Sequence, residues 1–190
     1  TNKQTHAGTK YTHEFQLALD SQEILGAFEF DKKSTGDFCE VDTKLRLVSP
    51  WTEDVKGELQ LKYNDVEYNP VIIIEYSPGQ KVELSNTIKI NDAFYYLETS
   101  LVTPFWDPLG LKLNVDFKPR PAVTLVIMKG SAKTTIDISG SLESKKLEGQ
   151  LEIISSYLTY PFSMEVTYDT SAEQKTAHLG VVYDKKYEIK

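Results

Sequence analysis

The sequence lacks most of the residues on which enzyme chemistry depends. Its 190 residues include one cysteine and three histidines, and its ten glycines occur singly rather than in a phosphate-binding loop. No nucleophile with a neighbouring base, and no metal-ligand spacing, accompanies the histidines. The sequence therefore predicts a protein that is not an enzyme and has no metal or cofactor of its own.

Two further absences narrow the class of partner. Acidic residues outnumber basic ones, 28 to 21, and the net charge is −7, which disfavours nucleic acid because phosphate binding requires clustered Lys and Arg. No apolar run reaches the roughly 18 residues of a membrane-spanning helix. The single cysteine, Cys39, cannot form a disulfide within the chain, and a buried, unreactive thiol is expected there.

Alternation of apolar and polar residues is abundant, whereas helical periodicity is nearly absent. Phe15, Leu17 and Leu19 alternate with polar or small residues, and similar runs recur at roughly 8 to 12 residue spacing between turn signals. The continuous apolar run Val71–Ile74 predicts a strand buried on both faces. The whole chain, 1–190, is predicted to be all-β: one antiparallel meander of about a dozen amphipathic strands, connected by short turns.

An internal repeat lies within this pattern. Leu47–Trp51 reads Leu-Val-Ser-Pro-Trp, and Leu101–Phe105, 54 residues later, reads Leu-Val-Thr-Pro-Phe. A weaker third copy, Ile153–Tyr157, lacks the proline. Independent convergence of similar hairpins is the alternative explanation. The predicted repeat units hold about four strands each and lie near 41–94, 95–146 and 147–190.

A strand that ends in Ser-Pro-Trp or Thr-Pro-Phe, followed by a short aspartate-bearing loop and a strongly alternating strand, resembles the large lipid transfer proteins, and the apolipophorins most of all. The resemblance is carried by residues 45–63, 97–117 and, less closely, 151–168. It implies the lipid-carrying β-sheet of a secreted lipoprotein, related to apolipoprotein B and vitellogenin. It also implies that the chain is a piece of a longer polypeptide.

The resemblance further implies lipid transport outside the cell, with phospholipid and acylglycerol as ligands and other segments of the same polypeptide as partners. Independently of the resemblance, a meander with one apolar face needs a cover of some kind in water. The residues expected to face lipid are Leu45, Leu47, Leu59, Leu61, Tyr63, Leu97, Leu101, Leu111, Leu113, Val115, Phe117, Leu151, Ile153, Met164, Val166 and Tyr168.

Four aromatic residues are expected at one rim of the sheet: Trp51, Phe105, Trp106 and Tyr157. They either close the end of the apolar layer or lie at a lipid boundary, where amphipathic rings are favoured. Two other architectures share the same periodicity. One is a closed barrel, either a small-ligand carrier or an outer-membrane barrel, and the other is a structural or adhesive β-sandwich with a dry interior.

Overall fold

The strands cover almost all of the chain. The structure, a computed structural model, describes residues 2–19, 22–118, 120–171 and 175–189, and these form fifteen strands. In chain order the strands are β1 (Asn2–Ala7), β2 (Lys10–Leu19), β3 (Gln22–Thr35), β4 (Phe38–Ser49), β5 (Thr52–Tyr63), β6 (Glu67–Ser77), β7 (Gln80–Ile90), β8 (Phe94–Val102), β9 (Leu109–Asp116), β10 (Ala122–Lys129), β11 (Ala132–Glu143), β12 (Lys146–Ser155), β13 (Phe162–Asp169), β14 (Thr176–Tyr183) and β15 (Lys185–Ile189).

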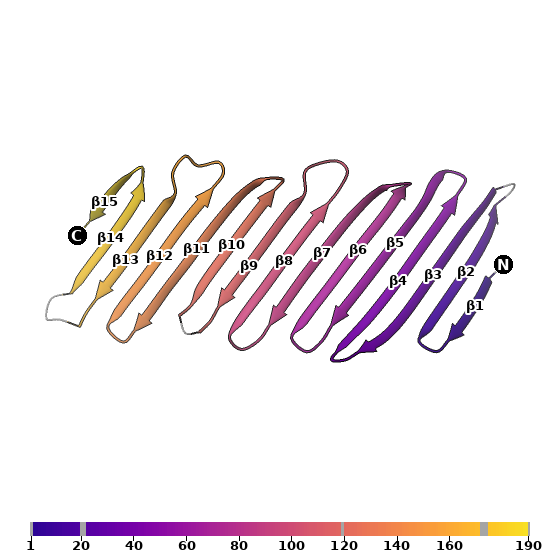
Figure 1. Ribbon diagram of the computed structural model, residues 1–190, viewed down its shortest axis with the longest axis horizontal. Helices are drawn as coiled ribbons and strands as arrows, with labels where there is room; N and C mark the ends of the chain where they lie inside the picture. Colours follow the sequence, from indigo (N-terminus) through magenta and orange to yellow (C-terminus); the bar gives the residue numbers. More distant parts are fainter. Residues whose placement is uncertain (1, 20–21, 119, 172–174, 190) are drawn as a thin grey trace. The chain divides into compact units, whose positions relative to one another are not determined.

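The strand order in the sheet is the order along the chain, from β1 to β15 (Figure 1). The pairings of β1 through β6 and of β9 through β15 are antiparallel, as short connections require. The predicted all-β meander is confirmed. Within the described part of the chain the strands belong to one sheet and the order is not closed into a ring, so neither a sandwich nor a closed barrel is formed.

Tight turns separate the strands where the sequence supplies residues that tolerate them. Gly36 between β3 and β4 and Gly79 between β6 and β7 have φ values of 63° and 76°, a left-handed conformation that glycine adopts without steric cost. Asn64 and Asn91 cap two other turns, because each side-chain oxygen accepts two backbone N–H groups. Local turn chemistry thus explains why a meander forms.

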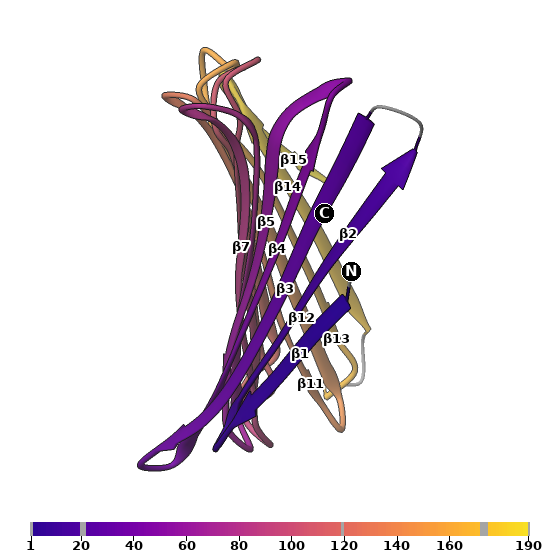
Figure 2. The same cartoon turned by 90° about the vertical axis from the view of Figure 1, so that its right-hand side faces the viewer.

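The contacts divide the sheet into two compact units. Unit 1 comprises Thr1–Ile88 with Thr99–Pro108, and unit 2 comprises Lys89–Glu98 with Leu109–Lys190. Each unit is described by itself below. In unit 1, strands β1 to β5 lie in a single twisted layer (Figure 2), as expected from the right-handed twist of strands. The three predicted repeat units stay a prediction.

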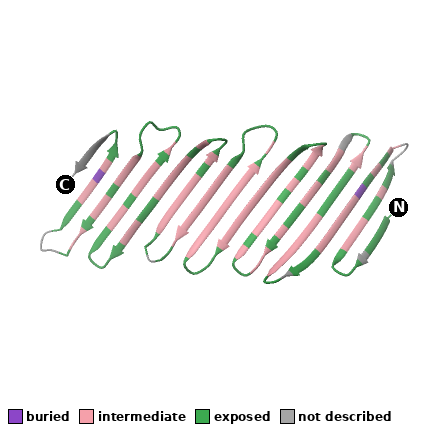
Figure 3. Ribbon diagram, in the orientation of Figure 1, coloured by how far each residue is buried: buried purple, intermediate pink, exposed green. Residues whose placement is uncertain are grey.

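No hydrophobic side chain among the described residues is buried, so neither unit has a conventional core. The only buried residues in the described part are Gly26 in β3 and Gly180 in β14, and half-buried or exposed residues occupy the rest (Figure 3). The expectation that Val71–Ile74 is buried on both faces is wrong: Ile72 and Ile74 are 40% and 46% exposed. The apolar run forms one strand of an uncovered sheet.

The described chain contains more strands than the dozen or so expected. One reason is β1, whose sequence Asn-Lys-Gln-Thr-His-Ala has no apolar alternation. It pairs with β2 along its whole length, from Asn2 opposite Phe15 to Ala7 opposite Lys10. Backbone hydrogen bonding to a neighbour therefore makes a strand that periodicity cannot detect. In the described residues there is no helix long and apolar enough to cross a membrane.

Candidate functional site: the apolar face of the sheet

The register of unit 1 gathers its apolar side chains on one face. Directly paired residues of antiparallel strands point to the same side, so the pairs Leu45 with Gly57 and Leu61 with Val41 fix that side. The apolar face of unit 1 then carries Tyr11, His13, Phe15, Leu17, Ile24, Phe28, Phe30, Cys39, Val41, Leu45, Leu47, Val55, Leu59, Leu61, Tyr63, Tyr68, Pro70, Ile72 and Ile74.

Five residues predicted to face lipid lie together on this surface: Leu45, Leu47, Leu59, Leu61 and Tyr63. Leu101, also predicted to face lipid, lies in β8 on the same side of its strand as Thr99, outside the paired strands β1 to β6 that define this face. Alternation in each strand, propagated through the register, is the reason that the five share a face.

Unit 2 repeats the arrangement with a different set of strands. The Glu98 carboxylate pairs with Lys112 at 2.6 Å, so these two side chains lie on the same face of the sheet. Because successive side chains of a strand point to opposite faces, Leu97 in β8 lies on the other face, together with Leu111 and Leu113 in β9. Register places further apolar residues there: Leu109, Val115, Val123, Leu125, Ile127, Ile136, Ile138, Leu142, Leu147, Leu151, Ile153, Phe162, Met164, Val166, Tyr168, Leu179 and Val181.

The remaining predicted residues of unit 2 fall on this face with one exception. Val115, Leu151, Ile153, Met164, Val166 and Tyr168 are members of it. Phe117 lies one residue beyond the end of β9, outside the paired residues that define the face; its backbone N–H donates to the Ala93 carbonyl and its side chain is 51% exposed.

The prediction omitted more than half of the apolar residues on these two faces. Phe28 and Phe30 in β3 and Ile136 and Ile138 in β11 occupy the same surfaces as the predicted residues. Their alternation is as regular as that of the residues chosen, and extending the pattern to every strand would have included them. The predicted residues lie within the repeat segments, which cover only part of the chain.

The apolar face is exposed rather than packed. Leu45 is 52% exposed in unit 1 and Ile138 is 49% exposed in unit 2, although each lies at the middle of a strand. Only neighbours within the same sheet partly cover them. Burying apolar surface contributes about 25 cal/mol per Å², so the uncovered faces represent a large unrealised stabilisation in water.

Glycines leave gaps in this face that neighbouring rings can fill. The Phe15 ring lies over Gly26, where an added Cβ would come within 2.1 Å of the ring, and this explains why a glycine in the middle of β3 is buried. In unit 2, Gly140 and Gly149 are directly paired between Ile138–Leu151 and Leu142–Leu147. Nothing lies within 4 Å of a Cβ built on Gly149.

Some polar side chains lie among the apolar ones; Thr43, for example, is directly opposite Phe30 and Leu59. The Thr99 hydroxyl donates to Asn86 Oδ1 at 2.8 Å between β7 and β8. Cys39, half-exposed and free, lies opposite Tyr63, and its hydrogen bond raises the pKa of the Tyr63 hydroxyl. The thiol is therefore not fully buried, contrary to expectation. Tyr63 in turn stacks on Tyr68 with ring centroids 6.1 Å apart.

The opposite face of unit 1 is a lattice of ion pairs, and we call it the charged face. Lys44 lies 3.5 Å from Glu58, and Lys62 lies 3.0 Å from Glu40, each across neighbouring strands. Arg46 donates three hydrogen bonds of 2.8 to 3.0 Å to Asp54. These bonds hold the pKa of the Asp54 carboxyl below its usual value of 3.8.

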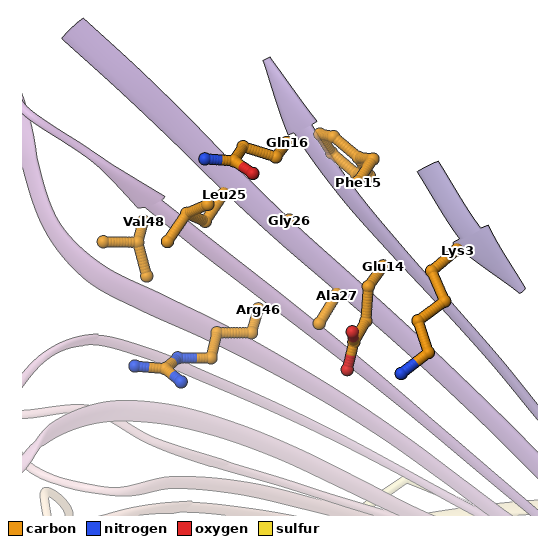
Figure 4. A pocket seen from close by; sticks show the side chains of 9 residues that line it. All are labelled: Lys3, Glu14, Phe15, Gln16, Leu25, Gly26, Ala27, Arg46 and Val48. Carbon is orange, nitrogen blue, oxygen red and sulfur yellow. The ribbon is translucent and has the colours of Figure 1, made fainter. Parts of the chain in front are cut away.

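A hollow lies in the charged face of β1 to β4 (Figure 4). Lys3, Glu14, Ala27 and Arg46 form one cross-strand row along it. Its lining consists of Lys3, Glu14, Phe15, Gln16, Leu25, Gly26, Ala27, Arg46 and Val48. Lys3, Glu14 and Arg46 border a lining that is mainly apolar, and the hollow is open to solvent rather than enclosed.

The four predicted aromatic residues lie in turns that recur every fourth strand. Trp51 follows β4, Phe105 and Trp106 follow β8, and Tyr157 follows β12. In each turn the aromatic N–H donates to the hydroxyl two residues earlier: Trp51 to Ser49 at 3.3 Å, Phe105 to Thr103 at 3.1 Å and Tyr157 to Ser155 at 3.2 Å. The same local turn thus presents an aromatic ring three times.

The histidines and acidic residues do not converge. His13 contacts Asn2 at 2.5 Å on the apolar face of unit 1, whereas His178 lies in β14 of unit 2 opposite Thr167. Within the residues described here, no group of three His, Cys, Asp or Glu side chains could hold a metal ion.

Neither a protein-family model, nor a curated protein, nor a solved structure matches this chain.

Proposed function

We propose that the chain binds lipid on the apolar face of its sheet, as the lipid-carrying portion of a secreted lipoprotein. The observation that carries the proposal is the uncovered face itself: long amphipathic strands place leucine, isoleucine, valine and aromatic side chains on one side, and no described hydrophobic residue is buried. A hydrophobic surface of this size requires a cover in water. Lipid supplies one without a second layer of protein.

The character of the face also favours lipid over a ligand that needs specific recognition. Polar side chains on this face, such as Thr43 opposite Phe30 and Leu59, are scattered among apolar ones. Binding would be driven by removal of apolar area from water and would select weakly among acyl chains. Phospholipid and acylglycerol are therefore the proposed ligands, and other segments of the same polypeptide are the proposed protein partners.

Flotation with triolein droplets coated by phosphatidylcholine tests the proposal. We expect the chain to float with the droplets, and Leu61→Glu on the apolar face to weaken binding about tenfold, because burying one leucine contributes roughly 1.5–3 kcal/mol. The matched control is Gln60→Glu, which adds the same charge one residue away on the charged face. Equal binding by the two variants, or no flotation of the unmodified chain, would refute the proposal.

A further inference from the structure

The two ends of the strands in unit 1 differ in chemistry. Turns that follow β4 and β8 lie at the same end as the last residues of β6 (Figure 1). At this end Trp51, Phe105 and Trp106 are 61%, 65% and 51% exposed. We call this end the aromatic rim of unit 1, comprising Trp51, Tyr76, Phe105 and Trp106.

The rings of this rim are held in place while remaining exposed. Tyr76 stacks on Phe105 with centroids 5.8 Å apart, and Phe105 lies 6.0 Å from Trp106. The turn hydrogen bonds to Ser49 and Thr103 satisfy backbone N–H groups beside the rings. If the rings served to close the apolar layer, they would be covered by it. More than half of each of these three exposed side chains instead faces outward.

Unit 2 shows the same chemistry after its own even-numbered strands. Tyr157, 74% exposed, follows β12 and repeats the turn hydrogen bond. Tyr160, in the same turn, contacts Tyr183 at the end of β14 with centroids 6.5 Å apart. Three tyrosines thus occupy positions equivalent to the aromatic rim of unit 1.

The turns at the opposite end of the unit 1 strands are rich in glycine, asparagine and aspartate, and the stacked rings of Tyr63 and Tyr68 flank one of them. These turns include Gly8–Thr9, Gly36–Asp37 and Asn64–Val66, and we call these residues the polar rim. Val66, 50% exposed, is the one large exposed hydrophobic residue in the three turns. The difference between the rims is one of chemistry, since both consist of short, exposed hairpin connections.

We propose that the aromatic rim of unit 1 docks on a phospholipid surface at headgroup level while its polar rim stays in water. The inference rests on the proposed function and deepens it. Tryptophan and tyrosine are favoured where one end of the ring meets acyl chains and the other meets water. A 12-residue strand such as β5 is about 40 Å long, so an inclined sheet holds its two rims at different depths.

The two tryptophans of the chain are Trp51 and Trp106, and both lie on the aromatic rim. Their intrinsic fluorescence therefore reports this rim alone. In vesicles of phosphatidylcholine brominated at different acyl positions, we expect quenching of Trp51 and Trp106 that is strongest for shallow bromines. The comparison protein is Trp51→Phe/Trp106→Phe/Val66→Trp, which moves the probe to the polar rim and should lose at least about two thirds of the quenching.

Three outcomes would overturn the proposal. Equal quenching at both rims would show that the sheet lies flat, and absence of quenching at Trp51 and Trp106 with flotation retained would show that another part of the chain contacts lipid. Both results refute the docking rim and leave lipid binding intact. Loss of flotation for the unmodified chain would refute the proposed function and the docking rim together.

Discussion

Among the described residues, the charged face of unit 1 holds more ion pairs than that of unit 2. Unit 1 sets opposite charges against each other across strands, for example Lys44 with Glu58 at 3.5 Å and Lys56 with Glu75 at 3.5 Å. Unit 2 has ion pairs as well, such as Lys112 with Glu98 at 2.6 Å, and it also uses hydroxyl groups: Thr124 donates to Asp137 at 2.6 Å in a row where Asp137 lies directly opposite Glu152. Like charges lie side by side in both units, since Asp31 is directly opposite Asp42 in unit 1.

The apolar faces, in contrast, are alike. Both units place one large apolar side chain at nearly every second position, and in both units these side chains remain half-exposed or exposed. The comparison indicates that the pattern of charges differs between the two units. The apolar side is the one whose chemistry is held constant, as expected if it contacts the same material throughout.

The largest expected effect is a loss of droplet binding, which shows whether both apolar faces bind lipid. We expect Leu59→Glu/Leu61→Glu in unit 1 and Leu111→Glu/Leu113→Glu in unit 2 each to weaken droplet binding by about a hundredfold, because each double variant removes two buried leucines from the lipid contact. Flotation across a range of droplet concentrations measures this, with circular dichroism to verify the sheet. If one double variant binds as tightly as the unmodified chain, the two faces do not share a function.

A smaller effect is expected from the paired glycines of unit 2. Gly140→Ala brings a Cβ to 2.9 Å from the Glu148 carbonyl oxygen, whereas nothing lies within 4 Å at Gly149. We expect Gly140→Ala to lower the free energy of unfolding by about 1 kcal/mol and Gly149→Ala to raise it by about 0.5–1 kcal/mol. Urea unfolding of the two variants provides the measurement. The same sign for both would contradict the described register.

Like charges directly opposite each other should cost unit 2 some stability. Asp137→Asn removes the repulsion with Glu152 while keeping an oxygen that accepts the Thr124 hydroxyl. We expect a gain of about 0.2–1 kcal/mol, which should shrink in 1 M NaCl as the repulsion is screened. Thermal unfolding at low and high salt measures both parts. A loss of stability at low salt would show that the carboxylate is needed where it stands.

The smallest effect concerns the ion pairs of unit 1. Because Arg46 lowers the pKa of Asp54 in the folded chain, the stabilisation from this pair is present above the ordinary value of 3.8 and is lost as the pH falls through the lowered value. We expect Arg46→Gln to be slightly less stable than the unmodified chain at pH 7 and equal to it in sufficiently acidic buffer. Urea unfolding of both proteins over that pH range measures this difference in stability. If the variant stays less stable in acid, the effect comes from packing of the arginine stem rather than from the ion pair.

The sequence predicted the all-β meander because period-2 alternation and turn residues are both local signals. Once a segment is assigned to a strand, its alternating apolar residues identify the apolar side, as Phe15 with Leu17 and Leu59 with Leu61 do. The wholly polar β1 was not predicted, since its strand conformation depends on pairing with β2. The continuous run at 71–74 was misinterpreted, because apolar residues on both faces do not require that both faces be covered.

The candidate site was predicted in kind but not in extent. Alternation identifies which side of a strand is apolar, yet only the register shows that Phe28 and Leu45 belong to one continuous surface. The exposure of the aromatic turn residues also depends on three-dimensional structure, since the motif Ser-Pro-Trp is equally compatible with a covered ring.

The most direct test of the central claim is mass spectrometry of the lipids extracted from natively purified protein. We expect phospholipid or acylglycerol to copurify in several molecules per chain, because the uncovered apolar faces need a cover. A lipid-free monomer that unfolds in one cooperative transition would contradict the account, since it would show that the sheet is stable in water with its apolar faces uncovered or covered only by its own residues.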